Sequence, residues 1–232
     1  MSESEPTAIA VFARAPLPGA VKTRLARHIG PCAAFELYAA MLRDTLEAAK
    51  SAAGALDGCE VVLAFTPHDA FAAGEYSLLP FWSGARMQQC EGDIGRRMLD
   101  CIARLQDAGK RRVVLIGSDT PDLGARTICD NVRLLQEYEL TLCRSADGGF
   151  NLIGASAPLP DELFHSVEWS TKRTFAHVAK NAAALCMNWT HSYHGHDDVD
   201  TAADLQVLVQ RLRTFPESAP HTRCWLRSQN LL

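Results

Sequence analysis

An apolar run that ends in a loop of acidic residues is the feature that most constrains this chain. Residues 113–116 (VVLI) contain no polar side chain, and Gly117-Ser118-Asp119 follows them directly. A short apolar run bounded by turn residues is typical of a parallel strand that is buried on both faces. Open α/β sheets bind their ligands at the carboxyl ends of such strands. The sequence therefore predicts an α/β fold with a ligand site at Asp119.

We expect the Asp119 carboxylate to bind a cation. Pro121 ends the strand, and no basic residue lies nearby in the sequence to neutralise the acid. The alternative is that Asp119 is an ordinary loop residue and that Asp122 caps the helix that follows. The choice between these two interpretations depends on which other polar residues the rest of the chain supplies.

Strand and helix signals alternate along residues 7–212 and predict one domain. Buried strands are expected at residues 7–13, 59–65, 113–116 and 140–143, with further strands at 81–89, 150–153 and 184–189. Helices are expected at residues 31–50, 94–105, 124–138, 172–184 and 202–212, with a short one at 68–76. Strand-helix-strand order implies parallel pairing. The prediction is a single three-layer α/β/α domain with a mostly parallel sheet, spanning residues 1–232, in which residues 213–232 are a tail that packs on the body or on another subunit.

A stiff basic loop follows the first predicted strand. Its sequence, RAPLPGAVKTR, combines two prolines and a glycine with three cations. Lys22 offers a point charge and Arg24 a bidentate fork, while Gly19 lets the backbone approach a ligand. Together with Arg14 these residues suit a polyphosphate. The spacing matches neither a P-loop nor a dinucleotide-binding glycine motif, so a solvated basic loop is the alternative.

Composition excludes several classes of protein. The 232 residues carry a formal net charge of -4, which argues against a chain whose main partner is nucleic acid. No apolar stretch approaches the ~20 residues that span a bilayer, and the first residues lack a signal-peptide core, so we expect a cytoplasmic protein. The eight cysteines are scattered singly and are expected to be reduced. A zinc site at His191, His194 and His196 is less favoured than a polar loop.

Two later segments carry further polar candidates. Asp147-Gly148-Gly149 precedes the strand predicted at residues 150–153, and its glycines allow close backbone approach to a ligand, although a plain hairpin turn has the same composition. Residues 196–204 hold four aspartates just before a predicted helix, and Asp200 or Thr201 is a natural cap for that helix. At least one of these acids is therefore expected to be structural.

Six stretches, in chain order, carry a resemblance to a known group. They are VFARAPLPGAVKTRLA, EGDIGRRM, GSDTPDL, ADGGFNLIG, EWST and DVDTAADL. Together, over residues 7 to 212, they resemble the bacterial glycosyltransferases of the DUF2064 type, the radical-SAM/selenodomain-associated transferase group. That group is similar to the GT-A fold of nucleotide-diphospho-sugar transferases. This sequence departs from the group's pattern at CRSADGG and at Phe150-Asn151, where paired aromatic residues are usual.

The resemblance implies a role for each candidate. Arg14, Lys22 and Arg24 would meet the nucleotide phosphates. Asp119 would bind the metal, with Asp198 or Asp200 as the second acid. Asp147, Gly148 and Gly149 would line the acceptor or sugar side, and Asp147 is our candidate for the group that accepts the acceptor's proton. Mg2+ or Mn2+ is the implied cofactor, because hard cations prefer carboxylate oxygens.

Three functions remain open at this point. The first is a metal-dependent transferase that moves a sugar from a nucleotide-diphospho-sugar to an unknown acceptor. The second is a nucleotidyltransferase that joins an NTP to a phosphorylated acceptor and releases pyrophosphate, for which the basic loop is a partial match. The third is a nucleotide-binding module without catalysis. The tail with Trp225 leaves a homodimer open as well.

Overall fold

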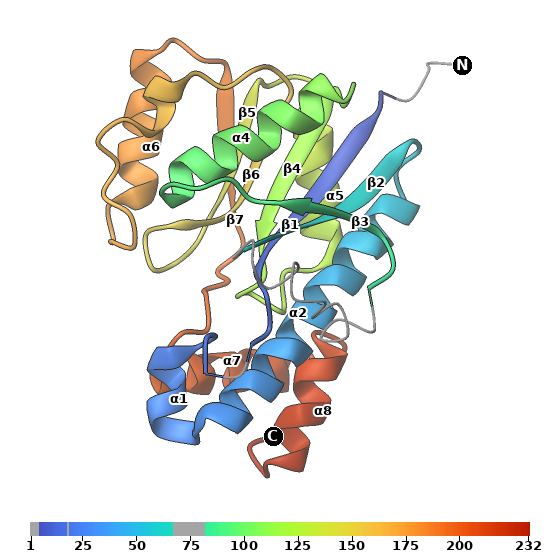
Figure 1. The fold of residues 1–232 in the computed structure, drawn as a ribbon, viewed down its shortest axis with the longest axis vertical. Coiled ribbons are helices and arrows are strands. Elements are labelled where there is room, and N and C mark those ends of the chain that lie inside the picture. The colour runs from blue at the N-terminus through green and yellow to red at the C-terminus, as the bar shows by residue number, and fades with distance from the viewer. Residues whose placement is uncertain (1–4, 18, 67–81) are drawn as a thin grey trace.

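The structure is a computed structural model that describes residues 5–17, 19–66 and 82–232. The short helix expected at residues 68–76 lies outside these residues. Within them, seven strands form one sheet in the order β3-β2-β1-β4-β6-β5-β7 (Figure 1). The strands are β1 Thr7–Arg14, β2 Cys59–Thr66, β3 Ala85–Gln88, β4 Arg112–Gly117, β5 Leu140–Arg144, β6 Phe150–Ala155 and β7 Trp189–Tyr193. Strand β6 pairs antiparallel with β4 and β5, and the other pairings are parallel. The predicted α/β fold with a mostly parallel sheet is confirmed.

Helices cover both faces of this sheet. They are α1 Thr23–Ile29, α2 Pro31–Gly54, α4 Ile94–Asp107, α5 Ala125–Leu134, α6 Thr174–Ala184, α7 Ala202–Thr214 and α8 Pro220–Ser228, with a 3-10 turn at Asp161–Phe164. Residues of α2 and α5 share one core with Ile9 and Val11 of β1, whereas α4 and α6 share the other core with Ala8 and Ala10. Because both faces of β1 are covered, its sequence is apolar without alternation.

Helix α2 is long enough to organise a second packing unit beyond the sheet. Leu37 and Met41 of α2 contact a buried cluster that draws on α1, α7 and α8 (Figure 1). The Asp44 carboxylate accepts hydrogen bonds from the main-chain nitrogens of His221 (2.9 Å) and Thr222 (2.8 Å), which are free donors in the first turn of α8. The C-terminal tail therefore packs on the body of its own chain. No helix in the described ranges is long and apolar enough to cross a membrane.

Several predicted boundaries were wrong. The last strand lies at Trp189–Tyr193 and not at 184–189, because α6 continues to Ala184, Leu185 is its C-cap, and Cys186 then adopts a left-handed turn (φ 53°). Helix α5 ends at Leu134, four residues earlier than predicted. No helix was predicted before residue 31, but α1 begins directly after Lys22 and includes the last two residues of the basic loop. A strand was predicted within residues 81–89, and β3 at Ala85–Gln88 confirms it; residue 81 lies outside the described residues.

Candidate functional site

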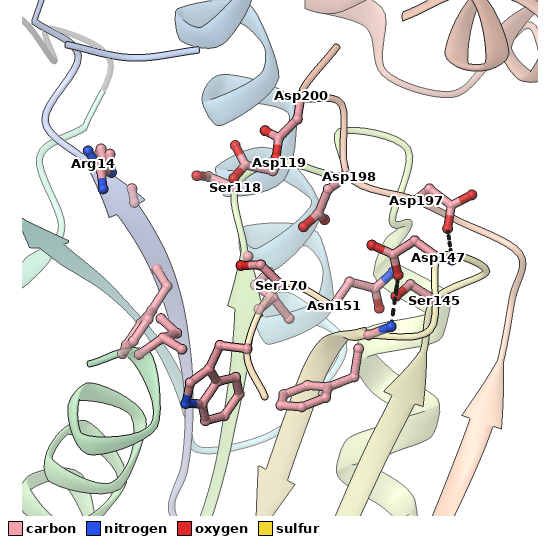
Figure 2. A pocket seen from close by; sticks show the side chains of 18 of the residues that line it. Arg14, Ser118, Asp119, Ser145, Asp147, Asn151, Ser170, Asp197, Asp198 and Asp200 are labelled. Carbon is pink, nitrogen blue, oxygen red and sulfur yellow. Dashed lines mark hydrogen bonds between the residues drawn. The ribbon is translucent and has the colours of Figure 1, made fainter. Parts of the chain in front are cut away.

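A cleft of about 940 Å3 lies at the edge where β1, β2 and β4 end. Strand β6 runs in the opposite direction to β4, so its first residues reach the same edge as the last residues of β4 and β5. The segment of residues 197–201, which leads into α7, also borders the cleft. Figure 2 shows Arg14 on one side of this space, Asp119, Asp198 and Asp200 in the middle, and Asp147 and Asp197 on the other side.

The structure brings Asp119 and Asp200 together around the Lys22 ammonium. Lys22 Nζ lies 2.6 Å from Asp119 Oδ1 and 3.0 Å from Asp200 Oδ1, and the Lys22 side chain is only 3% exposed. Burial alone would lower the pKa of Lys22, but the two carboxylates outweigh it and raise that pKa above its ordinary value. The expectation that no basic residue neutralises Asp119 was therefore wrong. Lys22 is distant in sequence, and the β1–β4 pairing brings it close.

Asp198 is the third acid of this cluster and is open to the cleft. Its Oδ1 accepts a hydrogen bond of 2.8 Å from the Thr120 hydroxyl. The surrounding protein displaces solvent and the Asp119 carboxylate repels a second negative charge, and together these effects raise the pKa of Asp198 to about 7. Additional positive charge between Asp119 and Asp198 would relieve this repulsion.

The donor set suits a hard divalent cation, because all three candidates offer carboxylate oxygens, and the Lys22 charge offsets only part of the burial and repulsion that act on Asp198. Asp119 and Asp200 are engaged by Lys22. In this arrangement, no group of three or more His, Cys, Asp or Glu side chains in the described part of the chain is ready to hold a metal ion. The acids fit Mg2+ or Mn2+ by chemistry, and Lys22 is the group with which such an ion would compete.

Asp122 anchors the segment before α7 that carries Asp197, Asp198 and Asp200. It does not cap a helix, contrary to the alternative considered from the sequence. Arg211 binds both of its oxygens (Nε to Oδ2 2.7 Å, Nη2 to Oδ1 3.0 Å), and His196 Nδ1 lies 3.1 Å from Oδ2. Burial acts to raise the pKa of Asp122, but the hydrogen bonds and charges of His196 and Arg211 lower it below its ordinary value. Helix α5 begins instead after Gly124, without a side-chain cap.

The basic side of the cleft is built on β1. Tyr38 fixes its geometry, since its hydroxyl accepts a hydrogen bond from Arg14 N (2.8 Å) and donates one to Arg14 O (2.9 Å). Burial and the nearby Asp119 carboxylate raise the pKa of Tyr38 to about 12. Arg14 and Arg24 line the cleft, and Arg24 Nη1 lies 3.8 Å from Asp200 Oδ2. Gly19, by contrast, adopts a turn conformation (φ 78°) and does not line the cleft.

The β5–β6 turn carries Asp147 on the opposite side. Asp147 Oδ1 accepts hydrogen bonds from the Ser145 hydroxyl and from Gly149 N (2.8 Å), which is the turn geometry that the alternative interpretation predicts. Asp147 N in turn donates to Asp197 Oδ1 (3.0 Å). Gly149 lines the cleft with Asp147.

Gly148 has a structural role, because it packs against the start of α6. It adopts φ 94°, and a Cβ atom there would overlap the main-chain oxygen of Lys172. Gly148 O also accepts a hydrogen bond from Phe175 N (2.9 Å) at the start of α6. This close approach joins the Asp147 turn to residues 170–175, so Gly148 shapes the cleft without lining it.

We expect Gly148→Ala to lower the free energy of unfolding by about 1–3 kcal/mol more than Gly109→Ala does. Gly109 has a similar backbone angle (φ 89°), but a Cβ there meets open space, so the pair separates the overlap with Lys172 from the cost of the backbone angle. Urea unfolding of the two variants measures the difference. Equal decreases in the free energy of unfolding would show that residues 170–175 shift to accommodate the new methyl group.

Sequence reasoning missed several residues of the site. Tyr38 falls within the helix predicted at residues 31–50 and was not named as a site residue, although a tyrosine hydroxyl on an apolar helix face requires a partner and was a usable signal. Asn151 lies at the floor of the cleft, and Gln89 ties the ends of β2 and α4 together through Ala64 O (2.9 Å) and Arg97 Nη1 (3.3 Å). Of the histidines at 191–196, His191 lies in β7 and His196 pairs with Asp122.

Comparisons with known proteins agree with this architecture. A family model described as "Uncharacterized protein conserved in bacteria (DUF2064)" matches residues 46–171. A provisionally named nucleotide-diphospho-sugar transferase from Desulfovibrio desulfuricans G20 is similar with 26% identity and a TM-score of 0.85, over 97% of this chain and 95% of that one. A comparison with curated proteins gives no match.

Two more distant structures share the fold. A cytidylyltransferase from Leptospira borgpetersenii serovar Hardjo-bovis (strain JB197) has 14% identity and a TM-score of 0.58, over 97% of this chain and 95% of that one. Rv0371C of Mycobacterium tuberculosis H37Rv, solved as a complex with manganese, has 18% identity and a TM-score of 0.54, over 90% of this chain and 100% of that one.

The chain therefore has the α/β fold of the nucleotide-diphospho-sugar transferases. It belongs to the DUF2064 family of bacterial proteins.

Proposed function

We propose that the protein is a metal-dependent transferase that uses a nucleotide-diphospho-sugar as donor and glycosylates a separate acceptor. The observation that carries this proposal is the division of charge across one cleft. Arg14, Lys22 and Arg24 come from the end of β1 and the start of α1 and line the cleft. Figure 2 shows Asp147 and Asp197 on the side opposite Arg14, with Asp119, Asp198 and Asp200 between them. A donor with a charged diphosphate and an acceptor without one would each find a matching side.

The basic residues suit the donor diphosphate. Arg14 and Arg24 offer planar forks for phosphate oxygens, and Lys22 holds positive charge where these residues meet the acids. Asp119 and Asp198, with Asp200 beside them, would hold Mg2+ or Mn2+. When bound, the cation supplies positive charge that stabilises the departing diphosphate. The similar protein from Desulfovibrio desulfuricans carries the name of such a transferase, which supports the proposal.

In the proposed reaction an acceptor hydroxyl oxygen forms a bond to the anomeric carbon of the sugar. The bond from that carbon to the diphosphate oxygen breaks, and the nucleoside diphosphate leaves with the bonding electrons. The hydroxyl proton passes to a carboxylate, for which Asp147 is our candidate. One oxygen of Asp147 is occupied by Ser145 and Gly149, so the proton would go to Oδ2.

A thermal-shift panel of NTPs, NDPs and nucleotide-sugars, each with Mn2+ and with EDTA, tests the proposal. A ligand that binds only the folded protein raises the melting temperature by mass action. We expect one NDP and its sugar conjugate to stabilise the protein, and we expect EDTA to remove that effect. A response to an NTP alone would instead favour nucleotidyl transfer to a phosphorylated acceptor. A flat panel would favour a non-catalytic protein.

A further inference from the structure

Asn151, the second residue of β6, has a buried side-chain amide whose nitrogen has a hydrogen-bond partner and whose oxygen has none among the described residues. The residue is 6% exposed and lines the floor of the cleft, between Asp198 and Asp147 (Figure 2). Its Nδ2 lies 3.4 Å from the main-chain oxygen of His196. A carbonyl oxygen can only accept, so this contact fixes which end of the amide points there. Asn151 Oδ1 then has no hydrogen-bond partner among the described residues.

An unpaired buried amide oxygen is costly. Leaving such an acceptor without a donor costs the desolvation of that group with no hydrogen bond in return. Native proteins satisfy most buried polar atoms, and the exceptions mark strained or functional positions. Because Asn151 lies on the cleft floor, a ligand that enters this side of the cleft is the natural source of the missing donor. That ligand must bring a hydrogen atom on oxygen or nitrogen.

The groups around Asn151 also accept hydrogen bonds or carry negative charge. Asp147, Asp197 and Asp198 surround it (Figure 2), and the Ser145 hydroxyl is already committed to Asp147. Lys172, an exposed residue, is the cation that lines this part of the cleft. A phosphate or carboxylate placed here would face three carboxylates and one amide oxygen, with Lys172 as the cation on the other side. Hydroxyl groups would be favoured, since each can donate to one of these oxygens.

The neighbouring wall of the cleft is aromatic. Phe150 and Trp169 both line it, with their rings edge to face at 6.4 Å between centroids. Trp169 is held against α4 at Gly95, where any Cβ atom would overlap its ring. Aromatic side chains combine a large apolar surface with a defined geometry. Acceptor oxygens beside aromatic rings suit a molecule with several hydroxyl groups and apolar C–H faces.

We propose that Asn151 binds the acceptor, and that the acceptor is an uncharged, hydroxyl-rich molecule such as a polyol or sugar, not a phosphorylated compound. A hydroxyl of this acceptor donates its hydrogen bond to Asn151 Oδ1. The inference rests on the proposed function and deepens it, because it names the class of acceptor. It also separates sugar transfer from nucleotidyl transfer, which needs a phosphorylated acceptor.

Matched acceptor pairs test the class of acceptor. With the donor found in the thermal-shift panel and with Mn2+, release of nucleoside diphosphate is measured with glycerol against glycerol 3-phosphate and with glucose against glucose 6-phosphate. We expect the uncharged member of a pair to accelerate release at least about 10-fold more than its phosphorylated partner. Preference for the phosphorylated member, or no acceleration by either polyol at high concentration, overturns the inference. Donor binding in the panel would still support the proposed function in that case.

Variants at two similar asparagines test the residue. Asn131 on α5 is also buried and also has an amide oxygen without a partner among the described residues, but it does not line the cleft. Asn151→Leu should raise the KM for the polyol about 10-fold or more, and Asn151→Ser, which keeps a polar group, should recover part of the loss. Asn131→Leu should leave that KM unchanged. Equal KM changes at both positions, in variants that melt as folded proteins, would assign Asn151 a structural role only.

Discussion

Asp119→Asn is expected to abolish cation-dependent nucleotide binding and to lower transferase activity by about 100-fold or more, the usual cost of removing a group that stabilises charge in the transition state. Asparagine keeps the size of the side chain and removes its charge. Asp198 and Asp200 remain, but Lys22 then neutralises Asp200 without competition, so Asp198 is the one acid of the three left to hold a divalent ion. Electron paramagnetic resonance of free Mn2+ measures cation binding directly, and the thermal-shift panel measures nucleotide binding.

Asp130→Asn is the matched control for this substitution. Asp130 lies on α5, is about half exposed, and pairs with Arg126 and Arg133 on the same helix. Exposed pairs of this kind contribute about 0–1 kcal/mol, so the control removes one carboxylate at little cost. Retention of Mn2+-dependent nucleotide binding by Asp119→Asn would remove Asp119 from the proposed cation site. Loss of binding in both variants would point to net charge and not to the site.

Local patterns predicted the strands that carry the site better than they predicted its contacts. The apolar run at 113–116 became β4, and Asp119 lies at its carboxyl end as expected. The contact between Asp119 and Lys22 was not predictable in the same way. It depends on β1 pairing with β4, which places the ends of two strands far apart in sequence next to each other. Hydrophobic periodicity reports which face of an element is buried and does not report which strand lies beside it.

The direction of β6 explains why Asn151 was not predicted as a site residue. A strand after a short glycine turn is easy to predict, and residues 150–153 were predicted as one. Its position between β4 and β5, antiparallel to both, decides that Asn151 reaches the same edge as Asp119. Asn151 drew notice in the sequence only as a departure from paired aromatic residues. The burial of its amide and the lack of a partner for Oδ1 among the described residues are properties of the packed structure.

Asp122 shows how a sound local rule can fail. An aspartate shortly before a helix is a frequent N-cap, and the sequence offered no reason to prefer another role. The structure instead pairs Asp122 with Arg211, which comes from a helix 89 residues later in the chain. The capping rule did hold at α7, where Thr201 and Asp204 form a reciprocal capping box. There all the partners are local, and no long-range ion pair competes for them.

Arg211→Met is expected to lower the free energy of unfolding by about 3 kcal/mol at pH 7, because it leaves the Asp122 carboxylate buried without its main partner. The side chains of Asp122 and Arg211 are 4% and 16% exposed. His196 Nδ1 remains 3.1 Å from Asp122 Oδ2 and offsets part of the loss. Arg213→Met is the control, since Arg213 is exposed on the same helix and donates a long hydrogen bond of 3.5 Å to Leu231 O. Urea unfolding of the two variants measures the difference.

The pH dependence of Arg211→Met follows from the lowered pKa of Asp122. A carboxyl group whose folded pKa is depressed stabilises the protein above its unfolded pKa of about 3.9, and that contribution is lost as the pH falls through the folded value. The gap between wild type and Arg211→Met should therefore be widest near neutral pH and should shrink below about pH 4. A gap that stays constant down to pH 3 would mean that Arg211 acts by packing alone. If the ion pair anchors the segment that carries Asp198 and Asp200, the same variant should also bind Mn2+ more weakly at pH 7, whereas Arg213→Met should not.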